Sequence, residues 1–344
     1  MDTNFYRYLV ALIWVYFTLL FGWLLLHQFT GDRIGVISLV NHLAVYLFLP
    51  LPLVILANLL LRRNEIWGLV LLGGIAFVWL WGGYFAPKSK LAAAASSETD
   101  TLTVMTFNVL GWQTDVLPQV NTIRAEKADV VFLQEVNLEL AAALQTELAA
   151  DYPYQALNPQ PDVSGMGVLS KYPLQPIAVS LPLPWVGDPQ VLSLDWQGRR
   201  ITLINFHMVP TTPGTVLQAT ALNRLREEEA RALTQTARQL SPAILAGDSN
   251  TTPLSEAYAI LTDGFGDAWK EAGFGLGHTF PGSNAAGSAR PSIAGAPLPM
   301  WLTRIDYILH SPDFHTVSAR MARFDGVSDH RGVVAALKWT AGLR

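Results

Sequence analysis

The chain has 344 residues, of which 51% are hydrophobic and 15% charged, with a formal net charge of −4 and no cysteine. Ordinary soluble proteins have about 25% charged residues, so this composition excludes a chain that is soluble along its whole length. The lack of cysteine excludes disulfides and thiol catalysis. It also fits an oxidising exterior without requiring one, because a thiol-free chain cannot mispair there.

The N-terminal part holds three apolar runs that are almost free of charge, Tyr8–Leu26, Ile34–Leu61 and Ile66–Phe85. Each is near or above the roughly 20 residues that a membrane-spanning helix needs. A signal peptide is the alternative for the first run, but no small-x-small cleavage site closes it and two further runs follow. The pattern predicts a transmembrane region over residues 1–87 with three helices, and hence a multi-pass protein of the cell membrane.

The basic residues of the short loops divide evenly between the two sides of such a membrane: Arg7, Arg62 and Arg63 on one, Arg33, Lys88 and Lys90 on the other. Basic loops favour the cytoplasm. The tight Arg62-Arg63 pair in a very short turn therefore favours a cytoplasmic N-terminus. Three spans then place the rest of the chain outside the cytoplasm.

The stretch from Ala86 to Asp100 holds Pro, Lys, Ala, Ser and acidic residues without an apolar period. It predicts a short solvated linker, which we assign to residues 88–100. Residues 101–344 then alternate strand-like and helical patterns, as is typical of an α/β domain. Strands are predicted at Thr101–Phe107, Asp129–Gln134, Gly165–Ser170, Val191–Trp196, Arg200–Phe206, Ala243–Ala246, Arg304–Leu309 and Val333–Lys338. Helices are predicted at Gln119–Lys127, Leu138–Ala150, Ala219–Leu240 and Pro253–Thr262.

Short polar motifs stand where the predicted strands end: Thr106-Phe107-Asn108, Leu133-Gln134-Glu135, Asn205-Phe206-His207, Gly247-Asp248-Ser249-Asn250, Arg304-Ile305-Asp306-Tyr307 and Ser328-Asp329-His330. One such motif alone is weak, because Asn, Asp and Gly after an apolar run usually mark a turn. Six in this order make residues from about Thr101 to Trp339 resemble the endonuclease/exonuclease/phosphatase superfamily, in particular its membrane-anchored bacterial branch. DNase I, the abasic-site endonucleases, inositol-polyphosphate 5-phosphatases and bacterial sphingomyelinases are relatives. The resemblance implies a DNase I-like four-layer αββα sandwich and metal-dependent hydrolysis of a phosphate ester.

Glu135 closes the apolar run Val130–Leu133, and a carboxylate there is costly to bury unless it is paired or coordinates a cation. Mg²⁺ suits this position because it takes oxygen ligands from one or two carboxylates; Mn²⁺ is the alternative cofactor. The resemblance makes Glu135 the main metal ligand, with Asn108 and Asp329 beside it. The amide of Asn108 can also donate to a phosphate oxygen without adding negative charge.

Asp248 and Asn250 follow the apolar strand Ala243–Ala246. Residues i and i+2 of an extended segment face the same way, so we expect both side chains in one pocket. Asp248 would orient or deprotonate the attacking water, while Asn250 would bind phosphate and stabilise the developing charge. By resemblance, His207 contacts the phosphate or assists departure of the leaving group.

The resemblance also assigns His330 to the scissile phosphate. Asp306 is expected to hold the other ring nitrogen of His330 and to raise its pKa, as a carboxylate does in a protease triad. Water is the expected nucleophile, because the chain has neither a cysteine nor a Gly-x-Ser-x-Gly elbow.

The substrate is less well defined by the sequence. From Thr101 onward, 17 Lys and Arg stand against 22 Asp and Glu, about −5 in all, whereas proteins that track nucleic acid usually show a basic surface. The charged residues of the predicted helix Ala219–Leu240, among them Arg226 and Glu229, are expected to form a solvated face.

Apolar segments at Leu181–Gly187, Met208–Leu217 and Gly277–Leu302 would suit a lipid-linked phosphate, a lipid pyrophosphate or a phospholipid head group beside the catalytic residues. These segments are equally compatible with long insertions that bind nothing. The leading hypothesis is therefore a membrane-anchored phosphatase or phosphodiesterase acting on such a lipid. The alternatives are an extracytoplasmic metal-dependent nuclease and an inactive binding module. No protein partner is evident from the sequence.

Overall fold

The protein was analysed as a computed structural model that describes residues 3–86, 100–210, 216–282, 290, 292–293 and 295–340. The predicted linker, residues 88–100, lies outside the described residues except for Asp100, whose carboxylate accepts a hydrogen bond from Arg199 at 3.1 Å. Parts of the predicted apolar segments Met208–Leu217 and Gly277–Leu302 also lie outside them.

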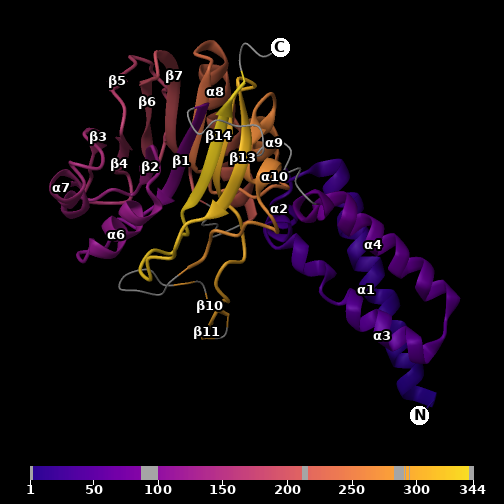
Figure 1. Cartoon of the computed structure of the whole chain (residues 1–344). Helices are drawn as coiled ribbons and strands as arrows, with labels where there is room; N and C mark the ends of the chain where they lie inside the picture. Colours follow the sequence, from indigo (N-terminus) through magenta and orange to yellow (C-terminus); the bar gives the residue numbers. More distant parts are fainter. Residues whose placement is uncertain are drawn as a thin grey trace.

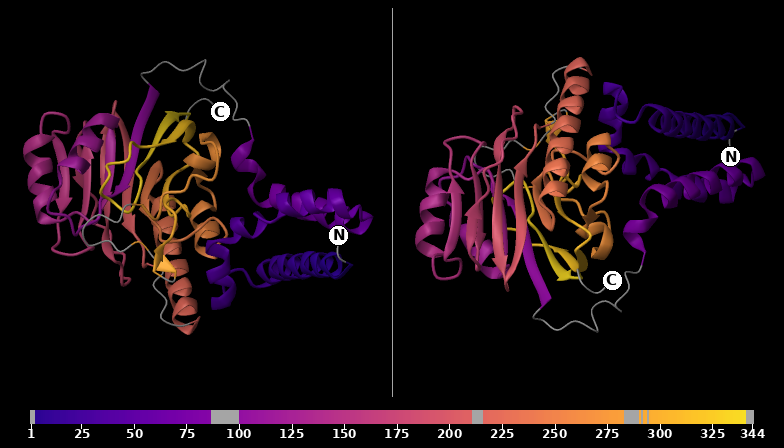
Figure 2. Two further views of the ribbon diagram at one scale, coloured as in Figure 1. Left: turned by 90° about the horizontal axis from the view of Figure 1, so that it is seen from below. Right: turned by 90° about the horizontal axis from the view of Figure 1, so that it is seen from above.

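The N-terminal region forms an apolar bundle of α1 (Thr3–Thr30), the 3₁₀ helix η1 (Ala44–Phe48) continued by α3 (Leu51–Leu61), and α4 (Asn64–Phe85). Three stretches of the described chain are long and apolar enough to cross a membrane, Asn4–Thr30, Ala44–Leu61 and Asn64–Phe85. Only 22%, 33% and 22% of their most apolar windows are buried. Most of the apolar side chains therefore face outward, as they would in contact with lipid. Figures 1 and 2 show the bundle projecting from one side of the molecule, with the N-terminus at its far end.

The prediction of a single helix over the second apolar run, Ile34–Leu61, is wrong. The structure divides it into α2 (Gly35–His42) and the η1–α3 segment, with a break at Leu43. Prolines at 50 and 52 lie further along, where α3 begins, a position that proline favours. Asn41 accepts a hydrogen bond from Trp23 of α1 and Ser38 accepts one from Asn223 of α8, so that α2 is fixed between the bundle and the sandwich.

The remainder of the described chain folds into two six-stranded mixed sheets and a two-stranded ribbon. The first sheet has the order β13 (Phe314–Met321), β14 (Val333–Trp339), β1 (Thr101–Asn108), β2 (Val130–Gln134), β4 (Met166–Ser170) and β3 (Tyr154–Asn158). The second has the order β5 (Leu174–Pro176), β6 (Gly187–Trp196), β7 (Arg199–His207), β8 (Ala243–Asp248), β12 (Asp306–His310) and β9 (Gly266–Asp267). The ribbon pairs β10 (Ser292–Ile293) with β11 (Ala296–Pro297).

Successive side chains along each strand point to opposite faces of the sheet, and this alternation produces the layers of the fold. In β2, Val130 and Phe132 face the core between the sheets, whereas Val131 and Leu133 face outward. The outward side chains pack under α6 (Leu117–Glu126) and α7 (Leu138–Glu147). The outer face of the second sheet packs in the same way under α8 (Val216–Gln239) and α9 (Glu256–Thr262), while the short α10 (Ala268–Ala272) lies against β12 and β13. This confirms the predicted four-layer sandwich (Figure 1).

All eight predicted strands and all four predicted helices are present, with ends shifted by a few residues. The sequence did not indicate β3, β5, β9, β10, β11 and β13. Most of these are two to five residues long, or lie at a sheet edge. The edge strand β13 carries polar residues and a register shift between Thr316 and Ser318, so its alternation is not clear in the sequence.

The bundle is joined to the sandwich by buried polar contacts that the sequence did not predict. Helix α2 packs on α8, where Asn223 Nδ2 donates to Asp32 O and Ser38 Oγ, both at 2.7 Å. The prediction that the charged residues of α8 form a solvated face is therefore wrong at two positions, since Arg226 is 1% exposed and Glu229 is completely buried. Packing against α2 removes this part of α8 from water.

A second buried contact ties the two sheets together directly beneath the catalytic motifs. Gln134 Nε2 donates to Asn205 Oδ1 at 2.7 Å, and Asn205 Nδ2 donates in turn to the carbonyls of Leu133 and Gly167 at 3.0 Å. Both amides are fully buried. They fix the relative position of the strand ends that carry Glu135 and His207.

Candidate active site

The predicted site residues lie at neighbouring strand ends. In the second sheet His207 is paired in register with Asp248 on the parallel strand β8, and Asp248 is paired with Asp306 on the antiparallel strand β12. In the first sheet Asn108 is paired with Gln134, the residue before Glu135. Face-to-face packing of the two sheets then brings these two rows together.

Asn108 connects the two rows. Its Nδ2 donates to Glu135 Oε1 at 3.0 Å and to Asp248 Oδ2 at 3.1 Å, while its Oδ1 accepts from the amide of Leu110. Asn108 thus acts in this structure as a hydrogen-bond donor toward the carboxylates. Its predicted role as a metal ligand stays a prediction.

Glu135 lies just past the end of β2 with a positive φ of 63°, a conformation that non-glycine residues adopt rarely and that is often found at functional sites. Its Oε2 accepts from the amide of Gly111 at 3.1 Å. A Cβ at Gly111 would lie 3.0 Å from the Glu135 carbonyl oxygen, so the close approach of this loop favours glycine.

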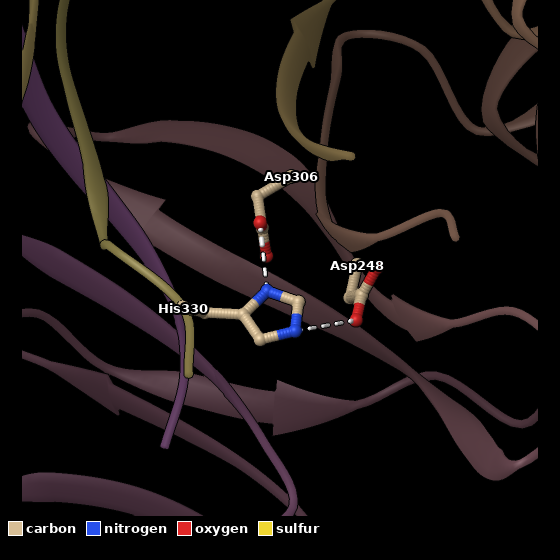
Figure 3. Close-up of side chains that lie close together, drawn as sticks. All are labelled: Asp248, Asp306 and His330. Atoms are coloured by element: carbon tan, nitrogen blue, oxygen red, sulfur yellow. Dashed lines mark hydrogen bonds and ion pairs between the residues drawn. The ribbon is translucent and has the colours of Figure 1, made fainter. Parts of the chain in front are cut away.

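His330 lies between two aspartates (Figure 3). Its Nδ1 is 2.9 Å from Asp306 Oδ2, and its Nε2 is 3.6 Å from Asp248 Oδ2. The loop is held by Ser328, whose Oγ donates to Asn108 O at 2.8 Å and accepts from the amide of His330. The expected orientation of His330 by Asp306 is therefore present in the geometry.

The charges of this cluster are strongly shifted. Burial alone would lower the pKa of His330, but the carboxylates of Asp306 and Asp248 outweigh it and raise this pKa well above the ordinary value. Burial raises the pKa of Asp248 to about 7; the imidazolium of His330 opposes this shift and Asp306 adds to it. The pair therefore offers a proton donor and a proton acceptor near neutral pH, as general acid–base chemistry requires.

His207 is the third side chain around Asp248, with its Nε2 3.6 Å from Asp248 Oδ2. Burial, and then the charge of His330, lower the pKa of His207 to about 3. The ring is therefore neutral under physiological conditions, and it can offer a hydrogen bond but no positive charge.

Asn250 reaches the same pocket as Asp248, but not for the reason expected. Strand β8 ends at Asp248, and Asn250 has a left-handed φ of 50°, so the extended i, i+2 geometry does not apply. A tight turn forms instead, in which Asp248 Oδ1 accepts from the amide of Asn250 at 2.8 Å. The side-chain nitrogen of Asn250 donates to Met208 O at 3.0 Å.

The acidic end of the site has the chemistry of a divalent-cation site. Burial, and then the nearby carboxylate of Asp329, raise the pKa of Glu135, while hydrogen bonds from Asn108 and Gly111 oppose the shift. Among the described residues that line the pocket, none is Lys or Arg. Two neighbouring carboxylates, in a lining that holds no Lys or Arg among the described residues, fit a hard cation such as Mg²⁺.

A second group, Asp248, Asp306 and His330, also brings three potential ligand atoms within 4.8 Å of one another. Here, however, the imidazole is hydrogen-bonded to Asp306 and favours its protonated form, which cannot bind a metal. This group therefore fits proton transfer better than metal binding.

The catalytic side chains lie in a cavity of about 560 Å³, within the roughly 300–1,000 Å³ typical of small-molecule sites. Each of the three apolar segments noted in the sequence contributes to its walls, through Val186, Pro210, and the group Phe280, Pro281, Leu298 and Leu302. The ring of Phe280 lies 5.0 Å from that of His330. The cavity therefore combines a polar floor of catalytic side chains with apolar walls.

Comparison with known proteins agrees with this architecture. The profile described as "Endonuclease/Exonuclease/phosphatase family" matches residues 105–330, which contain every predicted site residue. The chain belongs to this family. Its members are in general divalent-metal-dependent hydrolases. No curated protein matches the chain.

Several solved structures of the endonuclease/exonuclease/phosphatase fold are similar to the chain. An endonuclease/exonuclease/phosphatase from Beutenbergia cavernae has a TM-score of 0.50 and 24% identity over 70% of this chain and 72% of its own. A humanized D. rerio TDP2 has a TM-score of 0.52 and 17% identity, over 70% and 99%. A family protein from Leptotrichia buccalis has a TM-score of 0.51 and 18% identity, over 69% and 100%. At these identities the likeness concerns the fold alone.

Two residues of the site were given no role in the sequence analysis. Gly111 and Ser328 contact Glu135 and Asn108, respectively, whereas Phe280, which contacts His330, comes from one of the predicted apolar segments. Ser328 belongs to a motif already noted, so its neighbours could have suggested a role. Leu39, His42 and Leu43 of the N-terminal region also line the cavity, and no local pattern indicates this.

Proposed function

We propose that the protein is an integral membrane enzyme that hydrolyses a phosphate ester of a lipid head group, with a divalent cation as cofactor. The observation that carries this proposal is the cavity itself. Its floor holds Glu135, His207, Asp248 and His330, and its walls are built from apolar loop residues. Apolar walls beside a phosphate-binding floor suit a ligand that is polar at one end and apolar at the other.

The residues divide into two functional groups. Glu135 and Asp329 would hold the cation, Mg²⁺ or Mn²⁺, which when bound polarises the phosphoryl group and neutralises charge. Asp248 would accept the proton of the attacking water, since its pKa of about 7 lies near the working pH. His330, kept protonated by Asp306, would donate a charged hydrogen bond to a phosphate oxygen.

The remaining polar side chains would position the substrate. The neutral ring of His207 would bind a phosphate oxygen or assist the leaving group. Asn108 would keep Glu135 and Asp248 in register and contact the phosphate, and Asn250 would brace the turn behind Asp248 and contribute to phosphate binding.

The charge of the cavity favours a phosphodiester among lipid phosphates. A diester carries one negative charge, whereas a monoester or pyrophosphate carries more, and the described lining has no Lys or Arg to neutralise it. This favours phospholipid-like diesters over isoprenoid pyrophosphates. The nuclease alternative remains weaker because the domain is acidic.

Release assays on the full-length protein in lipid nanodiscs with Mg²⁺ test this function. We expect hydrolysis of a phospholipid diester to exceed that of a lipid pyrophosphate and of DNA, and to stop in excess chelator and in Glu135→Gln. A preference for DNA over every lipid phosphate would support the nuclease alternative. Undiminished turnover with chelator or in Glu135→Gln would overturn the metal assignment.

We infer the side of the membrane on which the domain lies from the basic residues of the bundle. Arg63 Nε donates to the hydroxyl of Tyr6 at 3.0 Å, so the turn between α3 and α4 lies beside the start of α1, at the far end from the sandwich (Figure 1). The basic cluster of Arg7, Arg62 and Arg63 thus gathers at one end, which supports a cytoplasmic N-terminus. A reporter fused after Arg344 should then be extracytoplasmic, and a cytoplasmic signal would overturn this topology.

A further inference from the structure

Helix α2 is fixed between the apolar bundle and the sandwich by its inner face. Ile37, Ser38 and Asn41 are buried. Ser38 Oγ accepts a hydrogen bond from Asn223 of α8 at 2.7 Å, and Asn41 Oδ1 accepts one from Trp23 Nε1 of α1 at 3.0 Å. These bonds to both sides set the rotation of α2 about its axis.

The opposite side of α2 carries apolar side chains at the catalytic cavity. Leu39 lies on α2, and Leu43 is the residue at which the helix ends. Both line the cavity that holds Asp248 and His330, yet they are 39% and 42% exposed. Because Leu39 and Leu43 line the cavity and are also partly exposed, they lie at its opening.

The apolar surface does not end at this opening. Ile34 and Val36, one turn earlier, are 45% and 53% exposed. Beyond them, α1 and the η1–α3 segment present the outward-facing apolar side chains of the bundle. Exposed apolar side chains are therefore present on the bundle, on α2 and at the opening of the cavity.

We propose that Leu39 and Leu43 form a binding subsite for the hydrocarbon chain of the lipid substrate next to its head group. This inference rests on the proposed lipid substrate and adds that the N-terminal region is part of the substrate site rather than only an anchor. The head group lies at the strand ends, the first part of the chain crosses α2, and the remainder stays in the bilayer.

The occupant follows from the position and chemistry of the surface. The apolar surface adjoins a phosphate-binding floor at one end and the apolar bundle at the other, so its ligand must be polar at one end and apolar at the other. Each methylene that leaves water favours binding by a factor of about four. Contact with Leu39 and Leu43 would therefore discriminate a lipid from a soluble ester with the same head group.

The first test is kinetic and uses the full-length protein in nanodiscs. It compares a long-chain phospholipid diester with methyl 4-nitrophenyl phosphate, a soluble diester without an alkyl chain. The ratio of the two kcat/KM values should fall at least tenfold in Leu39→Asn/Leu43→Asn. It should stay within twofold of wild type in Leu138→Asn, an equally polar change of an exposed leucine on α7, outside the cavity lining. Equal ratios in all three proteins would overturn the subsite.

The second test needs no turnover and uses the absence of cysteine in the chain. Leu43→Cys and Leu138→Cys each introduce a single thiol, the second on the exposed side of α7. The alkylation of each thiol by a maleimide is followed with and without a non-hydrolysable long-chain phosphonate diester. The phosphonate should slow alkylation of Leu43→Cys at least fivefold and leave Leu138→Cys unchanged, whereas no protection at Leu43→Cys, or equal protection at both, would overturn the subsite.

The two tests separate this inference from the proposed function. If wild type hydrolyses no lipid phosphate but the phosphonate protects Leu43→Cys, the subsite is supported and the proposed reaction is wrong. If lipid is hydrolysed and neither the protection nor the change in ratio is observed, the reaction stands and the subsite is wrong.

Discussion

Two buried clusters of charged residues in this protein are organised in opposite ways. In the first, Arg304 NH1 and NH2 donate to the two oxygens of Asp267 at 3.0 and 2.7 Å. The hydroxyl of Tyr258 donates to the same carboxylate at 2.6 Å, and the ring of Tyr307 lies 4.5 Å from the guanidinium. Burial opposes ionisation of Asp267, but the charge of Arg304 holds its pKa below the ordinary value.

The second cluster is the catalytic one, and it lacks this compensation. Asp248 is as deeply buried as Asp267, yet its only cationic neighbour among the described residues is His330 at 3.6 Å, which Asp306 also binds. The pKa of Asp248 is raised rather than lowered. Equal burial therefore gives a structural ion pair in one place and a reactive carboxylate in the other, depending on whether a matched cation is supplied.

The largest expected effect is on the rate, at the catalytic cluster. Asp248→Asn and His330→Ala should each lower kcat on a soluble diester by a factor of about 100 to 10,000, the usual effect of losing a positioned base or charge stabiliser. The double variant should lose less than the product, because both groups act on one transition state. Steady-state kinetics at saturating Mg²⁺ measure this.

The melting temperatures of the same variants test whether the catalytic cluster, unlike the Arg304–Asp267 cluster, contributes little to stability. Asp248→Asn removes a buried carboxylate that burial disfavours, so its melting temperature in detergent should equal or exceed that of wild type. If the rate losses of the two single variants multiply fully in the double variant, Asp248 and His330 do not act on one transition state. A large fall in the melting temperature of Asp248→Asn would mean that the catalytic cluster is also a structural one.

The next effect is on stability, at the Arg304 cluster. Arg304→Met leaves Asp267 buried without its cation and should cost roughly 3–5 kcal/mol. Arg238→Met is the matched control, because Arg238 pairs with Asp263 on the surface, where both are more than half exposed, and such pairs contribute about 0–1 kcal/mol. Thermal denaturation of the two variants should differ clearly, and equal shifts would contradict the distinction drawn here.

These clusters also show how far the sequence predicts the molecule. Asn108, Glu135, His207 and Asp248 were found because each directly follows an apolar strand, so its position in the fold can be read from its neighbours. Arg304 stood in a noted motif but received no role. Its partner Asp267 is 37 residues away and lies in a two-residue strand that the sequence does not indicate.

The junction with the bundle was missed for a related reason. Arg226 and Glu229 have the sequence pattern of an exposed helix face. Packing of α8 against residues nearly 200 positions earlier, together with contacts to Val209, buries them. A pattern local to the sequence can predict a strand end, but not the burial of a polar face by a distant helix.

A smaller effect is expected at Glu229, a buried carboxylate of this junction whose Oε1 has no hydrogen-bond partner among the described residues. Burial raises its pKa from 4.5 to about 8, against the opposing influence of the Val209 amide and Arg226. A raised folded-state pKa contributes stability below the unfolded pKa, and this contribution is lost as the pH rises through the folded value. Stability should therefore fall between about pH 4.5 and pH 8.

Glu229→Gln should remove this dependence and stabilise the protein at pH 8 relative to wild type, by roughly 1–3 kcal/mol, because glutamine keeps an acceptor for the Val209 amide but has no charge to bury. Glu228→Gln on the exposed side of α8 is the control and should leave the pH profile unchanged. Melting temperatures from pH 5 to pH 8 in detergent measure the effect, and parallel profiles for wild type and Glu229→Gln would contradict it.

The smallest effect concerns how firmly α2 is attached to the sandwich. Asn223→Ala removes the two donors to Asp32 O and Ser38 Oγ and leaves buried acceptors unsatisfied, at a cost of about 1–2 kcal/mol. Because the bundle is also tied through Tyr84 and Arg304, this change should open α2 locally without releasing the bundle. Amide hydrogen exchange of α2 should then rise about tenfold while that of α4 stays constant, and Asn121→Ala on the exposed side of α6 should change neither. Faster exchange in α4 as well would mean that the contact between α2 and α8, and not the Arg304 cluster, holds the two regions together.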